Sequence, residues 1–171
     1  MPSMKPWMEG IGDADLDESP DDELSPELLR TVRRLSETLK KLDLRALAST
    51  VAGSPHRILV IRPPADEEEP WALLDPVIES VGISRSDELE ECLCLPGLRV
   101  RVPRPRTVVL RARTLSQTPV RLKVGGALAR IFQHQLDHLD GILPTEWLQE
   151  ELRETLPDSV LRQPTACLGS L

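Results

Sequence analysis

The sequence predicts an α+β domain, and three features of the 171-residue chain support this fold class. An amphipathic helical pattern follows Ser25, a series of short β-rich runs extends from residue 57 to 124, and a second helical pattern covers 127–139. Helices flanking a group of strands are typical of this class. We expect the domain to span residues 25–157, between an acidic, mobile arm at 1–24 and a tail at 158–171.

The first helix has a clear start at Ser25. A serine N-cap, proline at the first helical position and an acidic residue near the positive end of the helix dipole follow one another there. Five apolar residues then fall on one helical stripe: Leu28, Val32, Leu35, Leu39 and Leu42. The stripe lasts only about two heptads, so it favours packing on the protein's own domain over a leucine zipper.

Short runs rich in β-branched and other apolar residues predict the strands. They cover residues 57–61, 72–78, 88–95, 99–102, 107–113 and 120–124, with a polar loop at 63–70 and a turn at Pro96-Gly97. Gly125-Gly126 ends the sheet pattern before the helix at 127–139. Thr145 is expected to cap a final helix that ends near Pro157.

Composition excludes several classes of function. A net charge of -7 and 2% aromatic residues argue against a nucleic-acid surface, which needs clustered cations and stacking rings. No apolar stretch approaches the length of about 20 residues that spans a bilayer. The acidic start has no apolar signal region, and three cysteines are too few for a disulfide framework. We therefore expect a cytoplasmic protein without a membrane segment.

The segment with the most chemical information contains His134 and His138. Histidines four positions apart lie on one helix face, where both imidazoles can reach the same cation. Cys92, on a predicted strand, offers a third ligand. A thiolate with two imidazoles leaves one coordination position open, as in catalytic rather than structural metal sites.

Three neighbouring residues have open roles. Cys94 is expected on the same strand face as Cys92, where it is either a competing ligand or a small buried hydrophobe. Asp137 and Asp140 lie beside the histidines, and one of them could orient an imidazole through a hydrogen bond.

These residues resemble the motifs of the peptide deformylase family. Residues 90–94 read Glu-Glu-Cys-Leu-Cys, where the family has Glu-Gly-Cys-Leu-Ser. Residues 133–141 read Gln-His-Gln-Leu-Asp-His-Leu-Asp-Gly, where the family has Gln-His-Glu-x-Asp-His-Leu-x-Gly. The resemblance runs from about residue 25 to 152 and includes the spacing between the two motifs.

The resemblance implies a fold, a cofactor and a reaction. It implies a mixed or antiparallel sheet around a central helix that bears the metal, with Fe2+ as the usual ion and Zn2+ as a substitute. It implies Cys92, His134 and His138 as ligands, and Arg104 and Leu93 as residues near the bound peptide. The implied reaction removes the formyl group from formyl-methionine of nascent polypeptides near the ribosome.

The departures from the family pattern concern the chemical step. Gln135 stands at the position of the family's general base, a glutamate, and an amide cannot accept a proton at neutral pH. The last six positions of the family's first motif, Gly-x-Gly-Leu-Ala-Ala-x-Gln, align with residues 46–51, so that Val51 replaces the glutamine that binds the oxyanion. Glu91 replaces the glycine before the cysteine ligand.

Three readings of the sequence follow. The first is a divergent deformylase with reduced or altered hydrolysis. The second is a pseudo-enzyme that binds a metal, and a peptide, without turnover. The third is a structural metal site that Cys94, Gln135 or Glu91 closes as fourth ligand.

Overall fold

The structure, a computed structural model, describes residues 24–62 and 69–162. The predicted arm at 1–24 lies outside the described residues except for Leu24, as do most of the predicted 63–70 loop and of the tail. The elements in chain order are α1 (Pro26–Lys41), β1 (Ala46–Ala48), η1 (Ser49–Ala52), β2 (Ile58–Ile61), β3 (Trp71–Val81), β4 (Arg85–Cys92), β5 (Leu95–Pro105), β6 (Thr107–Arg113), β7 (Pro119–Gly125), α2 (Gly126–Leu139), η2 (Pro144–Trp147), α3 (Glu150–Arg153) and α4 (Asp158–Leu161).

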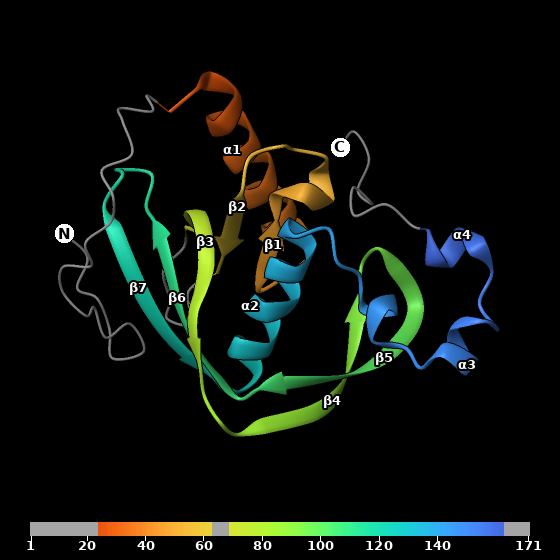
Figure 1. The fold of residues 1–171 in the computed structure, drawn as a ribbon. Helices are drawn as coiled ribbons and strands as arrows, with labels where there is room; N and C mark the ends of the chain where they lie inside the picture. The colour runs from red at the N-terminus through yellow and green to blue at the C-terminus, as the bar shows by residue number, and fades with distance from the viewer. Residues whose placement is uncertain (1–23, 63–68, 163–171) are drawn as a thin grey trace.

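The strands form two antiparallel sheets, which confirms the predicted α+β class. One sheet has the order β1-β2-β3-β6-β7, and β4 pairs with β5 in the other. Figure 1 shows the long helix α2 in the middle, between the five-stranded sheet and the β4–β5 hairpin. The predicted arrangement of sheets around a central helix is therefore correct.

Helix α2 follows β7 without a connecting loop. Gly126, its first residue, has a φ of 61°, a conformation that favours glycine because it has no Cβ. Most of the helix is buried, and Phe132 is fully buried in the core that α2 shares with both sheets. This burial fixes the backbone from which His134 and His138 project.

The prediction for α1 is confirmed at its start. The Ser25 side chain accepts a hydrogen bond from the Leu28 N–H at 3.1 Å, and Leu35 and Leu39 are buried in the domain core. The helix packs on its own domain, as predicted. Leu42 is the C-cap and is 43% exposed, so the buried stripe ends one turn earlier than predicted.

Two local predictions were wrong. The hairpin turn lies at Leu93 and Cys94, whereas Pro96 and Gly97 belong to β5. Cys94 is therefore in a turn and not on a strand face with Cys92.

The predicted final helix is broken. Its chain forms η2 and α3, and Leu148 between them is extended, with ψ near 141°. Thr145 is buried inside η2 instead of serving as an N-cap. Within the described residues, no helix has the length and apolar character needed to span a membrane.

Candidate metal centre

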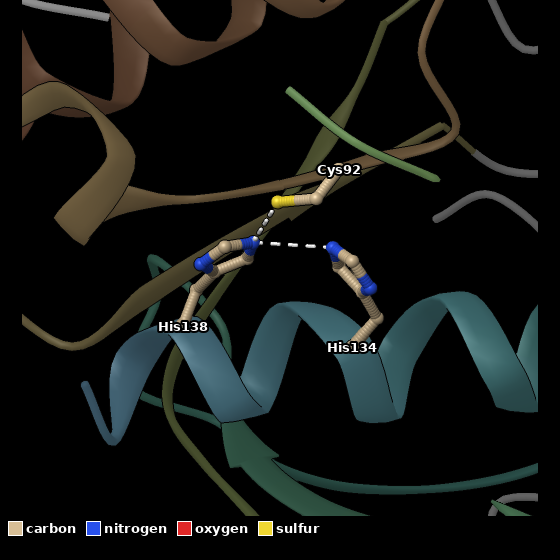
Figure 2. Close-up of side chains that lie close together, drawn as sticks. All are labelled: Cys92, His134 and His138. Atoms are coloured by element: carbon tan, nitrogen blue, oxygen red, sulfur yellow. Dashed lines mark hydrogen bonds between the residues drawn. The ribbon is translucent and has the colours of Figure 1, made fainter. Parts of the chain in front are cut away.

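Three side chains from two elements meet at one point. Cys92 is the last residue of β4, and His134 and His138 stand one turn apart on α2. Figure 2 shows the two imidazoles rising from the helix toward the Cys92 sulfur. All three residues are buried, and their ligand atoms lie within 4.8 Å of one another.

The distances between these atoms suit a shared metal ion. Cys92 Sγ is 3.2 Å from His138 Nε2, which is 3.1 Å from His134 Nε2. Two donors about 2.0–2.3 Å from one ion are themselves about 3–4 Å apart. The residues therefore fit a divalent ion bound by one thiolate and two imidazoles. Cys94 is buried but does not belong to this group.

Glu90 orients the first histidine. Its Oε2 is 2.9 Å from His134 Nδ1, so the Nε2 of the same ring faces the other two ligands. Glu90 and Cys92 alternate with exposed residues along β4, which places both on the inner face of the strand. The carboxylate is only 6% exposed.

Two arginines neutralise this buried carboxylate. Arg104 Nε and Nη2 lie 2.5 and 2.9 Å from its two oxygens, and Arg130 Nη1 lies 2.7 Å from Oε1. Arg130 also donates to the Val102 carbonyl at 2.8 Å and to Ser86, which ties α2 to both strands of the hairpin. Such pairing is what allows a carboxylate to remain charged when buried.

The network shifts the pKa values of the groups it contains. Burial raises the pKa of Glu90, but hydrogen bonds with His134 and Arg104 outweigh it and lower that pKa to about 2. Burial lowers the pKa of His134, yet its interactions with Cys92 and Glu90 raise it to about 9. Burial and the charges of His134 and Arg104 lower the pKa of His138 to about 3. His138 is thus neutral and ready to bind a metal, whereas His134 must first lose a proton.

Neither predicted aspartate orients a histidine. Asp137 Oδ2 pairs with Arg104 at 2.9 Å, and Asp140 Oδ1 pairs with Arg57 at 2.7 Å. His138 Nδ1 is buried without a hydrogen-bond partner among the described residues. The orienting carboxylate is Glu90, which carries the role that the sequence suggested for an aspartate.

A cavity of about 350 Å³ opens beside the three ligands. His134, His138 and Gln135 line it from α2, and Val51 and residues 43–47 line it from the chain around β1. Leu93, predicted to lie near a bound peptide, is 45% exposed and also lines it. Arg104, predicted for the same role, is 4% exposed and does not line this cavity.

The carboxamide of Gln135 has a fixed orientation. Its Oε1 accepts a hydrogen bond from the Ala48 backbone N–H at 2.8 Å, and only the oxygen of an amide can accept. The NH2 group is therefore directed away from β1, and it has no partner among the residues that the structure describes. Gln135 thus offers a hydrogen-bond donor, and no base, to a molecule in the cavity.

The other two departures also have definite places. Val51, in η1, is 2% exposed and presents an apolar side chain at the position that the sequence resemblance assigns to a glutamine. Glu91 lines the cavity, but its carboxylate pairs with Arg99 at 2.5 Å, and both side chains are 67% exposed. The charge of Glu91 is therefore exposed to solvent and paired with Arg99.

Sequence reasoning missed the roles of Glu90 and Arg130. Glu90 lies two positions before Cys92, so strand alternation could have placed it on the ligand face. Nothing local indicates Arg130, because its partners are 28 to 44 positions away in the sequence.

Comparisons with known proteins agree with this geometry. The family model described as polypeptide deformylase matches residues 15–154. A peptide deformylase of Thermomicrobium roseum is 34% identical over 153 residues, covering 84% of this chain and 85% of the relative. Peptide deformylase 2 of Gloeobacter violaceus is 30% identical over 131 residues, covering 75% of this chain and 70% of the relative.

Solved structures share the fold. Peptide deformylase 1B of Arabidopsis thaliana, in complex with an inhibitor, superposes with a TM-score of 0.73 at 25% identity, covering 82% of this chain and 78% of the other. A peptide deformylase of Synechococcus elongatus in complex with actinonin gives a TM-score of 0.68 at 30% identity, covering 76% and 72% of the two chains.

Proposed function

The chain belongs to the polypeptide deformylase family, and on this basis we propose that it is a metal-dependent protein that binds N-formylated peptides and hydrolyses them slowly. The observation that carries the proposal is the buried group of Cys92, His134 and His138 beside a cavity, with Gln135 at the position of the base. The proposed substrate is the formyl-methionyl end of nascent polypeptides in the cytoplasm, in the vicinity of the ribosome.

The three ligands would hold one divalent ion, with Fe2+ proposed by family resemblance and Zn2+ as a possible substitute. Such an ion supplies a Lewis acid and lowers the pKa of water to about 7. Glu90 fixes the ring of His134 in the tautomer that a metal requires, and Arg104 and Arg130 hold Glu90 charged. Positioning of the metal depends on this network, which is intact.

Proton transfer is where this site departs from an efficient hydrolase. Loss of a general base typically costs about 10²–10⁴ in rate, and loss of one oxyanion donor about 10²–10³. The Gln135 oxygen already accepts from Ala48, so its side chain offers only an NH2 donor where a base would accept, and the side chain of Val51 has no donor. We therefore expect binding to be retained better than turnover.

A deformylation assay of the purified, iron-loaded protein under anaerobic conditions tests the proposal. Formyl-Met-Ala-Ala-amide is the substrate, and release of the free amino terminus is measured against a preparation of the Cys92→Ser variant. We expect slow turnover that requires metal, with one ion per chain. Equal metal content in wild type, Cys92→Ser and His138→Ala would overturn the metal centre.

The alternative is a pseudo-enzyme that binds a formylated peptide without hydrolysis. The orientation of Gln135 favours it, because the Ala48 N–H holds the carboxamide oxygen and leaves only a donor for the ligand. Calorimetric binding of the same peptide with no detectable product would favour this alternative over slow hydrolysis.

A further inference from the structure

The acidic groups that line the cavity are all ion-paired. Asp43 pairs with Arg62 at 2.5 Å, Glu91 pairs with Arg99, and Glu90 is held by Arg104 and Arg130. Each of these carboxylates therefore already has an arginine partner. The chain has a negative net charge, but the acidic residues that line the cavity are balanced by arginines.

Arg45 is the exception among the charged side chains of the cavity. It lines the cavity, is exposed, and has no ion pair among the residues that the structure describes. Its backbone is nevertheless fixed, since its carbonyl accepts from the Arg62 N–H at 2.8 Å and β1 continues the pairing with β2. The guanidinium therefore projects from a rigid position at the rim.

Strand β1 follows Arg45, at the rim of the cavity, and ends at Ala48, beside Gln135 at the inner end. Arg45 is exposed, whereas Ala48 is fully buried and its N–H binds Gln135 next to the ligand histidines. Three residues of extended chain span about 10 Å. An extended peptide with its acyl oxygen at the Gln135 NH2 group would therefore bring its second or third residue to Arg45.

We propose that this cavity selects N-formylated peptides with acidic residues at the second and third positions, and that Arg45 is the residue that recognises them. The proposal rests on the proposed binding of formylated peptides and adds their charge class. Gln135 donates to the acyl oxygen at the inner end, and Arg45 attracts a carboxylate at the rim. The effect of one exposed cation on an acidic against a basic peptide is about tenfold at low salt, and it weakens as salt is added.

Isothermal titration calorimetry on the full-length, zinc-loaded protein tests this selection. The probes are formyl-Met-Asp-Asp-amide, formyl-Met-Ala-Ala-amide and formyl-Met-Lys-Lys-amide, whose amidated ends remove the terminal carboxylate. We expect affinity to fall in that order, with about tenfold between the first and the last. Arg45→Glu should reverse the order.

Lys123→Glu is the matched control, because it changes the net charge equally from an exposed position on β7, at the opposite edge of the five-stranded sheet. It should leave the order unchanged. Equal affinities for the three peptides, or equal effects of the two variants, would overturn the selection by Arg45 while leaving formyl-peptide binding in place. Absence of binding for all three peptides would overturn the proposed function and this inference together.

Discussion

The two walls of the site differ in how much of the family pattern they keep. The wall formed by β4 and α2 retains Cys92, His134 and His138 together with the Glu90 network behind them. The opposite side carries Val51, proposed to stand where the family has its oxyanion glutamine, and Gln135 of α2, which bonds to β1 and is proposed to stand where the family has its base. The difference separates the groups that hold a metal from those that move protons.

The physical cost of change also differs between the walls. Glu90 is nearly fully buried between Arg104 and Arg130, so its removal leaves an excess of positive charge in the interior. Gln135 has the shape of glutamate and keeps a hydrogen bond to β1, and Val51 packs in the core. The fold therefore tolerates loss of the catalytic groups much better than loss of the ligand network.

The largest effect is expected from restoring the proposed base and oxyanion donor at Gln135 and Val51. Gln135→Glu should raise kcat/KM on formyl-Met-Ala-Ala-amide by about 10²–10⁴, because it restores a general base. Addition of Val51→Gln should contribute about 10²–10³ more by restoring an oxyanion donor. Anaerobic assays of the iron-loaded single and double variants give both numbers.

Gln149→Glu provides the control, since it adds the same charge at an exposed position before α3. It should leave the rate unchanged. A double variant as slow as the wild type would mean that the two walls no longer form one hydrolytic site.

The next largest effect is expected from removing the charge of Glu90, which lies behind the proposed metal ligands. Glu90→Gln keeps the size of the side chain but leaves Arg104 and Arg130 without their buried counter-charge. We expect the free energy of unfolding of the metal-free protein to fall by about 3–5 kcal/mol in urea titrations. Zinc affinity, measured by chelator competition, should fall by about 10–100-fold because His134 loses its orienting partner.

The sequence predicted the ligand wall in part and the surrounding network hardly at all. The histidine pair has a helical spacing that is visible locally, α1 starts at a serine cap, and both helices carry periodic apolar residues. Glu90 acts through Arg104 and Arg130, which are 14 and 40 positions away. Such partners follow from tertiary packing and leave no local pattern.

The errors in element boundaries have a similar cause. Pro96-Gly97 is a strong turn signal, but the pairing of β4 with β5 closes the hairpin at Leu93 and Cys94. Gly97 instead uses its positive φ of 82° within β5. Cross-strand register decided the turn against the local propensity.

A smaller effect concerns pH and metal binding. His134 has its pKa raised to about 9, so at neutral pH a metal must displace its proton. Zinc affinity should therefore rise with pH as far as about pH 9, because the His134 proton is displaced more easily. The stability that protonated His134 gives the metal-free protein is complete below pH 6.5 and is lost as pH rises through about 9. In Glu90→Gln the rise in affinity should level off at a lower pH, and an unchanged profile would contradict the assigned cause.

The smallest effect is expected from Glu91→Gln, which tests whether the neighbour of Glu90 on β4 matters for stability and metal binding. Glu91 follows Glu90 on β4, but its pair with Arg99 is 67% exposed on both sides and screened by water. Glu91→Gln should change the free energy of unfolding by less than about 1 kcal/mol and leave zinc affinity unaltered, as urea titration and chelator competition can measure. A loss of stability and zinc affinity as large as that of Glu90→Gln would mean that the charge of Glu91 acts on the metal centre. Burial would then not explain why Glu90 matters more than its neighbour Glu91.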